Sequence, residues 1–230
     1  MEHTIMLQGI VGSTAYGLAG PDSDVDRLGL FAAPTVALLG LHTPAESQVS
    51  RAPDVTRHEA GKYCRLALGG NPTVSELMWL PAELYEVRTA FGDELIGIRG
   101  AFLSAKRIRD SYLGYATQQF RKLDNTFSSA TAGRTAKHAR HLLRLCWQGL
   151  HLYRTGELLI RLEDPAAFRA FGDSVAAGDI ELARRTLARY EADFAGLPSP
   201  LPDQPDERAV EDWLLRVRRA NYAPAGTVIG

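Results

Sequence analysis

The sequence is poor in cysteine and has no long hydrophobic run. Its two cysteines, Cys64 and Cys146, lie in apolar, helix-like segments without the partner spacing of a zinc site. This pattern excludes a disulfide-stapled secreted domain, and we expect two reduced core thiols in a cytoplasmic protein. No apolar segment reaches the roughly 20 residues of a transmembrane helix, and the amino terminus becomes polar too early for a signal peptide.

The sequence also has little net charge, −1, but its charges are unevenly distributed. Residues 1–100 carry 7 Lys and Arg against 12 Asp and Glu, whereas residues 101–161 carry 11 basic against 3 acidic side chains. The small net charge argues against a dedicated nucleic-acid-binding protein. The basic segment could still neutralise a triphosphate or a nucleic-acid backbone, or it could be an ordinary solvated helix surface.

The first informative segment is an apolar run followed by a glycine and a serine. Residues 5–11 are largely apolar and partly β-branched, which predicts a buried strand. Gly12 allows a tight turn and a close approach of a ligand, and Ser13 can cap a short helix. Free backbone amides at a helix start attract phosphate. The pattern is that of a phosphate-binding turn, although most such turns are only turns.

A pair of aspartates follows, Asp24 and Asp26, at the start of a second predicted strand over residues 24–31. Alternate side chains of a strand share a face, so the two carboxylates are expected on one side and Val25 in the core. Adjacent carboxylates repel unless a cation lies between them, and Mg²⁺ favours a few carboxylates together with substrate phosphate oxygens. A calcium loop does not fit, because Arg27 and Ala33 stand where that loop needs Gly and Glu. A solvated acidic turn is the remaining alternative.

The string GSTAYGLAGPDSDVDRLGLF, which contains both features, resembles the signature of the DNA polymerase β-type nucleotidyltransferase superfamily. The later strings GNPTVSELMWLP, SYLGYATQQ and KHARHLLRL are similar to the branch of predicted nucleotidyltransferases associated with RNA ligase and RNA repair. The resemblance covers roughly residues 5–160. It implies an α/β (α+β) fold with a small mixed sheet in a catalytic lobe at residues 1–100, followed by a helical lobe at residues 101–230.

The resemblance also implies roles for individual residues. Asp24 and Asp26 would hold two Mg²⁺ (or Mn²⁺) ions, and Gly12 and Ser13 would hold the β- and γ-phosphates of a nucleoside triphosphate. The superfamily typically adds a third carboxylate from a neighbouring strand. Asp54, which opens a short extended segment, is our first choice for it. Glu59 is the rival candidate, although it is more typical of the first turn of a helix. Glu76 is more typical of a helix start or a structural position.

The carboxy-terminal half is helical by pattern, with helices predicted over residues 103–123, continuous or broken near Gly114, and over residues 134–155, 179–194 and 206–220. One polar stripe runs along the second of these helices and consists of Lys137, His141, Arg144, Gln148 and His151. We expect Lys137, His141 and Arg144 to be candidates for phosphate contacts, Lys137 as a point charge and Arg144 as a planar fork. Metal binding by the histidines of this helix is disfavoured, because a third ligand is lacking.

The sequence therefore predicts a metal-dependent enzyme that transfers a nucleoside monophosphate from a nucleoside triphosphate to an acceptor hydroxyl. RNA is the first choice of acceptor, because of the branch resemblance and the basic segment. Transfer to a protein or a small molecule is the second reading. A binding module that senses nucleotide without turnover is the third.

Overall fold

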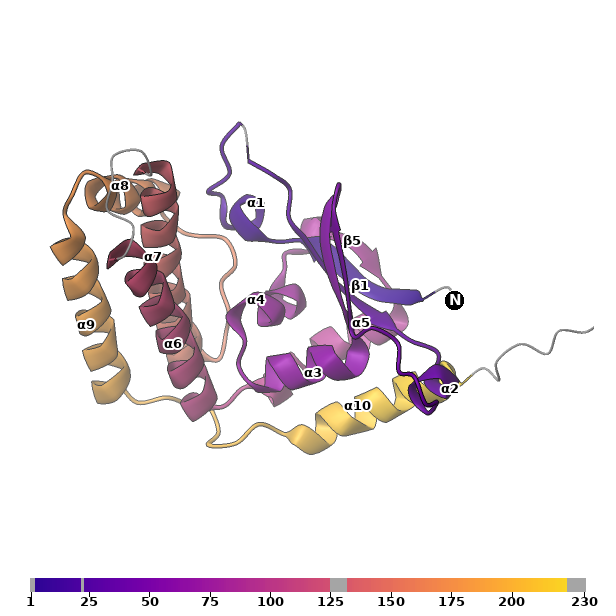
Figure 1. Cartoon of the computed structure of the whole chain (residues 1–230). Helices are drawn as coiled ribbons and strands as arrows, with labels where there is room; N and C mark the ends of the chain where they lie inside the picture. The colour runs from indigo at the N-terminus through magenta and orange to yellow at the C-terminus, as the bar shows by residue number, and fades with distance from the viewer. Residues whose placement is uncertain (1–2, 22, 125–131, 223–230) are drawn as a thin grey trace, which may run out of the picture.

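The computed structural model describes residues 3–21, 23–124 and 132–222, and its centre is a five-stranded sheet (Figure 1). The strands are β1 (Thr4–Ile10), β2 (Arg27–Ala32), β3 (Ser47–Arg51), β4 (Asp54–Glu59) and β5 (Tyr85–Arg88). Their order in the sheet is β3-β4-β2-β1-β5, with β2 and β4 parallel and all other pairs antiparallel. The prediction of a small mixed sheet is confirmed.

The strand β2 begins later than the sequence predicts. Ile10 pairs with Arg27, and β1 ends there. Before Arg27, one hydrogen bond from the Val11 amide to the Asp26 carbonyl (2.9 Å) joins this segment to the end of β1. Asp24 and Asp26 therefore lie in the segment that enters β2 and not on the strand. The expectation that Val25 points into the core is wrong, because Val25 is 39% exposed.

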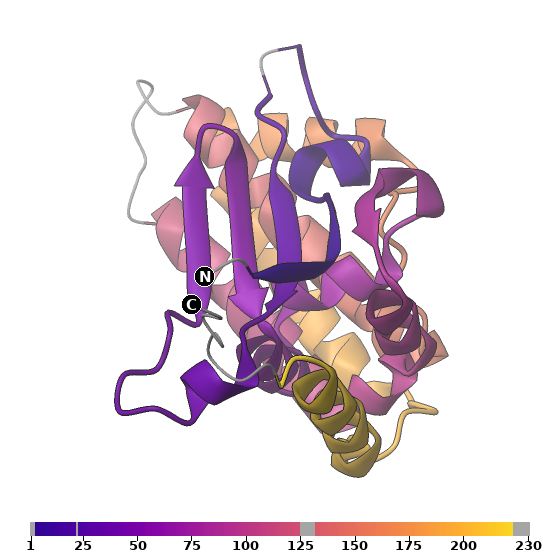
Figure 2. The ribbon, with the colours of Figure 1, turned by 90° about the vertical axis from the view of Figure 1, so that its right-hand side faces the viewer.

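Three longer helices pack against the sheet region. They are α3 (Ala60–Leu68), α5 (Ala90–Gly97) and, from the far end of the chain, α10 (Glu207–Ala220). Figures 1 and 2 show α10, in yellow, beside α3 and α5 at one end of the sheet. Short helices lie between the strands, namely α1 (Gly12–Tyr16), α2 (Thr35–Leu38) and α4 (Pro72–Ser75), with 3₁₀ turns η1 (Glu76–Trp79) and η2 (Ala82–Leu84). A third 3₁₀ turn, η3 (Arg99–Phe102), follows α5.

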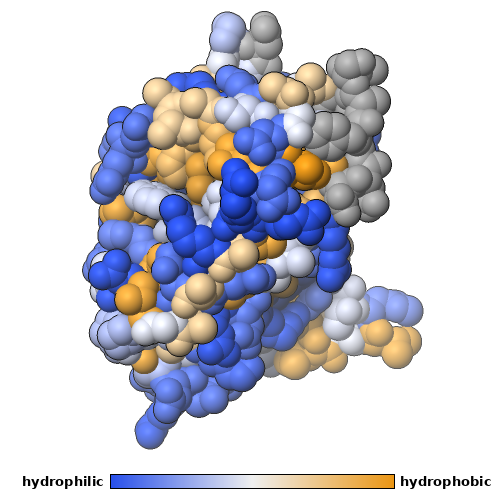
Figure 3. Space-filling model, turned by 90° about the vertical axis from the view of Figure 1, so that its left-hand side faces the viewer, coloured by the Kyte–Doolittle hydropathy of each residue, from blue (hydrophilic) through white to orange (hydrophobic). Residues whose placement is uncertain are grey.

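The remaining helices form a bundle beside the sheet. They are α6 (Ala105–Asp124), α7 (Ala132–Thr155), α8 (Pro165–Ala176) and α9 (Ile180–Gly196), and α7 packs against the other three. The helix α6 is continuous through Gly114, and Gly156, with a φ of 76°, follows the end of α7. Hydrophilic side chains cover much of the outer face of this bundle (Figure 3). The division of the chain at about residue 100 stays a prediction.

The two cysteines are free and buried, as the sequence predicts. Burial raises the pKa of both thiols to about 12, so they behave as small apolar groups in the core. Within the described ranges, no helix is both long and apolar enough to cross a membrane.

Candidate active site

A cleft of about 590 Å³ lies between the sheet region and α7. It is lined by every residue that the sequence singles out as catalytic or nucleotide-binding, namely Asp24, Asp26, Asp54, Gly12, Ser13, Lys137, His141 and Arg144. Residues more than 100 positions apart thus meet at one site, while the role of each remains a prediction.

The parallel pairing of β2 with β4 brings Asp26 and Asp54 together, and Asp24 is two residues before Asp26 in the chain. Arg27 pairs with Val55, so Asp26 and Asp54 stand one residue before the same rung of the sheet. Burial, and then the nearby charges of Asp54 and Asp24, raise the pKa of Asp26 above its ordinary value, although Lys137 acts in the opposite direction. The cleft therefore contains a group of like-charged carboxylates, which a nearby positive charge stabilises.

Gly12 makes room for one of these carboxylates. Its φ of 70° lies in the left-handed region, and a Cβ atom at this position would overlap the Oδ2 atom of Asp26. Two physical features thus favour glycine at this position: the left-handed backbone conformation and the close approach of the Asp26 carboxylate. The sequence motif and the carboxylate cluster are parts of one packed arrangement.

The structure also separates the two candidates for a third carboxylate. Side chains of β4 alternate between two faces of the sheet, and Asp54 lies on the face that lines the cleft. Glu59 is buried outside the cleft, where it accepts hydrogen bonds from both Nη atoms of Arg218 on α10 and, at 2.8 Å, from the Gly61 amide. Glu59 thus caps α3 and anchors α10, and Asp54 alone of the two accompanies Asp24 and Asp26.

The opposite wall of the cleft is α7. Lys137 lines the cleft, and its positive charge acts to lower the pKa of the Asp26 carboxyl. Arg140 also lines the cleft, and the sequence analysis missed it. The signal was available, because Arg140 is three residues after Lys137 and four before Arg144, and residues at these spacings share one side of a helix.

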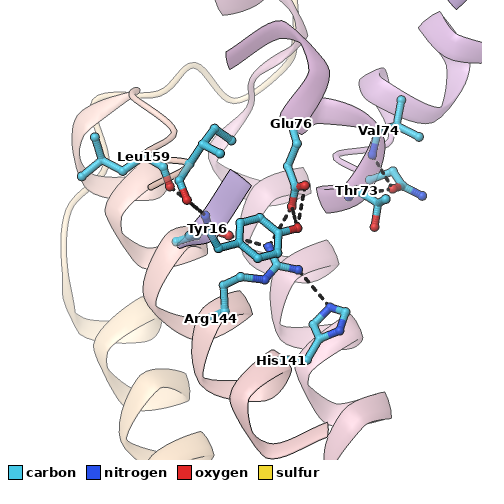
Figure 4. Close-up of polar contacts among 10 residues, drawn as sticks. Tyr16, Thr73, Val74, Glu76, His141, Arg144 and Leu159 are labelled. Carbon is cyan, nitrogen blue, oxygen red and sulfur yellow. Dashed lines mark hydrogen bonds and ion pairs between the residues drawn. The ribbon is translucent and has the colours of Figure 1, made fainter. Parts of the chain in front are cut away.

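Arg144 is the centre of a buried polar network that joins α7 to the sheet region (Figure 4). Its Nη1 atom donates to Glu76 Oε1 (2.7 Å) and to Gln148 Oε1 (2.5 Å). The Tyr16 hydroxyl bonds to the same Glu76 carboxylate (2.6 Å), and the guanidinium carbon stands 4.1 Å from the centre of the Tyr16 ring. Arg144 therefore has a structural function in addition to its position in the cleft wall. The predicted structural role of Glu76 agrees with these contacts.

His141 belongs to the same network as a neutral side chain. Burial and the adjacent charge of Arg144 lower its pKa to about 2, and its Nε2 atom lies 3.0 Å from Nη2 of Arg144. Because a guanidinium can only donate, His141 Nε2 accepts this hydrogen bond. A contact of His141 with phosphate would thus be made by a neutral imidazole. Gln148, the next residue of the predicted stripe, is buried and donates to the Leu159 carbonyl at 2.7 Å.

The family model of the RNA repair pathway DNA polymerase beta family (RlaP) matches residues 1–177. The match includes the whole sheet and every residue singled out above in the cleft, and it ends just after α8. No curated protein significantly matches the chain.

Proposed function

Because the chain belongs to the RNA repair pathway DNA polymerase beta family, we propose that it transfers a nucleoside monophosphate from a nucleoside triphosphate to a hydroxyl group of RNA. The observation that carries this proposal is the cluster of Asp24, Asp26 and Asp54 beside the Gly12 turn, in a cleft faced by Lys137. A group of carboxylates next to a glycine turn and a lysine is suited to phosphoryl chemistry, in which catalysis consists mainly of positioning and charge stabilisation.

The carboxylates of Asp24, Asp26 and Asp54 suit Mg²⁺ or Mn²⁺, which complete their coordination with substrate phosphates, better than a metal that protein side chains alone would hold. Among residues 3–21, 23–124 and 132–222, no three His, Cys, Asp or Glu side chains converge closely enough to form a metal cage. Magnesium commonly binds one or two carboxylates together with substrate phosphates and water. Asp24 and Asp26 would hold it, with Asp54 beside them. Bound there, the metal would lower the pKa of the acceptor hydroxyl and stabilise the leaving pyrophosphate.

The other residues would position the triphosphate. Gly12 allows the backbone to approach the β- and γ-phosphates closely, and Ser13 offers a hydroxyl donor. Lys137 would neutralise phosphate charge from the α7 side. The acceptor oxygen would then attack the α-phosphorus in line with the bond to the bridging oxygen, and pyrophosphate would leave.

Transfer of an α-labelled phosphate tests the proposal. Purified protein is incubated with each α-labelled nucleoside triphosphate and Mg²⁺, with RNA, with DNA, with a carrier protein or without an added acceptor. We expect label on RNA with the wild-type chain and at least a thousandfold loss, on the order of a removed catalytic group, in the Asp24→Asn/Asp26→Asn variant. Asp203→Asn, an exposed aspartate between α9 and α10, serves as the matched control.

Each outcome separates one reading from the others. Label on the carrier protein would show that the acceptor is a protein and not RNA. Nucleotide binding without any transfer would favour a nucleotide sensor. Full activity in the double variant, with its fold intact by circular dichroism, would exclude these aspartates from the chemistry.

A further inference from the structure

The cleft continues along β4 beyond the carboxylates. Asp54, Thr56 and His58 are alternate residues of this strand, and all three line the cleft, because alternate side chains share a face. Four residues of strand separate Asp54 from His58 by about 13 Å. His58 therefore lies too far along the strand to act on the same atom as Asp54, and it needs a different explanation.

Two successive hydrogen bonds, from Lys62 to Ser47 and between Ser47 and His58, fix the orientation of the His58 ring. Lys62 Nζ donates to Ser47 Oγ at 2.8 Å, and Ser47 Oγ lies 2.9 Å from His58 Nδ1. An ammonium group can only donate, which leaves the serine hydrogen available for Nδ1. Burial and the charge of Lys62 lower the pKa of His58, which favours the neutral ring. This arrangement favours the tautomer that carries its proton on Nε2, the nitrogen not engaged by Ser47.

The order of the sheet indicates which reactant passes over β4. The β1–α1 turn with Gly12 lies on one side of Asp26, and β4 with Asp54 lies on the other. In an in-line displacement the attacking and leaving oxygens stand on opposite sides of the phosphorus. If pyrophosphate leaves from the Gly12 side, the acceptor must enter from the β4 side. This step rests on the proposed function.

We propose that Thr56 and His58 form a subsite for the acceptor strand, in which His58 Nε2–H donates a hydrogen bond to a backbone oxygen of RNA upstream of the reacting hydroxyl. The oxygen belongs to a phosphodiester or to a ribose 2′-hydroxyl, and both can accept a hydrogen bond from a neutral imidazole. The nearby Lys62 ammonium adds a favourable potential for an anionic strand. His58 is a specificity residue in this arrangement and takes no part in bond making.

RNA binding without turnover tests this subsite. The probe is a fluorescent RNA oligonucleotide that ends in a 3′-deoxynucleotide, and its Kd is measured by anisotropy. We expect His58→Ala to raise the Kd for RNA about tenfold, on the order of one lost hydrogen bond, and to leave the Kd for nucleoside triphosphate unchanged. Ser47→Ala, which releases the ring, should weaken RNA binding by less. His42→Ala, an exposed histidine between α2 and β3, is the control and should bind RNA as the wild type does.

Modified oligonucleotides identify the oxygen. A methylphosphonate or a 2′-deoxy sugar, placed one to three nucleotides upstream of the end, should weaken binding to the wild type but not to His58→Ala. The imidazole ¹⁵N shifts of His58 should show the Nε2-protonated tautomer in wild type and a mixture in Ser47→Ala.

An unchanged Kd for RNA in His58→Ala, or a loss confined to nucleotide binding, would overturn the subsite. The binding assay needs no transfer, so a failure of the proposed reaction would be seen separately from a failure of the subsite.

Discussion

At the scale of single residues, the packing of Gly12 against Asp26 gives a sharp prediction. An alanine at position 12 must displace the Asp26 carboxylate, because its Cβ would overlap Oδ2, and must also adopt a left-handed φ. We expect Gly12→Ala to lower the rate of nucleotidyl transfer at least a hundredfold, since a misplacement of about 1 Å has that effect. The rate is measured with α-labelled nucleotide.

Gly17 provides the matched control for this substitution. It has a similar φ of 79°, but a Cβ there would meet only Pro165, at an ordinary distance of 3.6 Å. Gly17→Ala should therefore cost about 1 kcal/mol of stability from backbone strain and retain most of the activity. Equal losses of activity in the two variants would show that backbone strain, and not the carboxylate, explains the effect.

The residues of the cleft differ in how far the sequence could predict them. Asp24, Asp26 and Gly12 lie within 15 residues of each other, and local motif chemistry is enough to group them. The choice between Asp54 and Glu59 depends on the face that each presents, and this follows from where β4 begins and from Arg218, 159 residues further along. Arg144 could be placed on the correct side of its helix, but its burial against Glu76 could not be predicted from helical periodicity.

At the scale of elements, the network around Arg144 fastens α7 to α1 and η1. Glu76 is 1% exposed and Arg144 is 3% exposed, so removal of either partner leaves an uncompensated buried charge. We expect Arg144→Met to lower the free energy of unfolding by about 3 kcal/mol, whereas Tyr16→Phe, which removes one hydroxyl, should cost about 1 kcal/mol. Urea denaturation of the variants measures both.

A double variant separates the ion pair from simple packing. Glu76→Gln in the Arg144→Met background removes the stranded carboxylate, so the double variant should recover part of the stability lost in Arg144→Met. If the stability losses of the single variants Arg144→Met and Glu76→Gln add up to the loss of the double variant, the two side chains are not coupled, contrary to what the structure indicates.

Elements with strong local signals could be predicted, and elements defined by their neighbours could not. The helices α3, α6, α7, α9 and α10 have apolar periodicity, caps or terminating residues, and the structure contains each of them. The helix α8 was missed although Asp164 and Pro165 are a usable start signal, as the cap from Asp164 Oδ1 to the Ala167 amide confirms (3.0 Å). The edge strand β3, SQVSR, is polar and mostly exposed, so only its pairing with β4 defines it.

At the scale of the whole molecule, the last helix of the chain, α10, packs against elements from its first hundred residues. After the bundle, α10 packs on α3 and α5, and its Trp213 indole donates to the Phe91 carbonyl at 3.1 Å. Thr35 on α2 bonds to the Arg218 carbonyl and to the Asn221 carbonyl at the end of α10. Local sequence patterns contain no information on such distant partners. The last helix, α10, thus supports the sheet region that contains the carboxylates.

The ion pair of Arg218 with Glu59 should therefore matter more to folding than other charges on α10. The side chains of Arg218 and Glu59 are 19% and 4% exposed. Those of Arg216, also on α10, and its partner Glu94 on α5 are 48% and 43% exposed. We expect Arg218→Ala to cost about 3 kcal/mol at pH 7, and Arg216→Ala less than about 1 kcal/mol. Urea denaturation of the two variants makes a matched comparison, because the substitutions are two residues apart.

The pH dependence of this difference tests its cause. Burial alone would raise the pKa of Glu59, but hydrogen bonds and the charge of Arg218 outweigh it and lower the pKa below its ordinary value. The stabilisation is thus fully present above the ordinary glutamate pKa of about 4.3 and is lost as the pH falls through the lower folded-state pKa. The difference in free energy of unfolding between wild type and Arg218→Ala should become smaller at acid pH. A difference that does not change with pH would mean that Arg218 acts through packing alone.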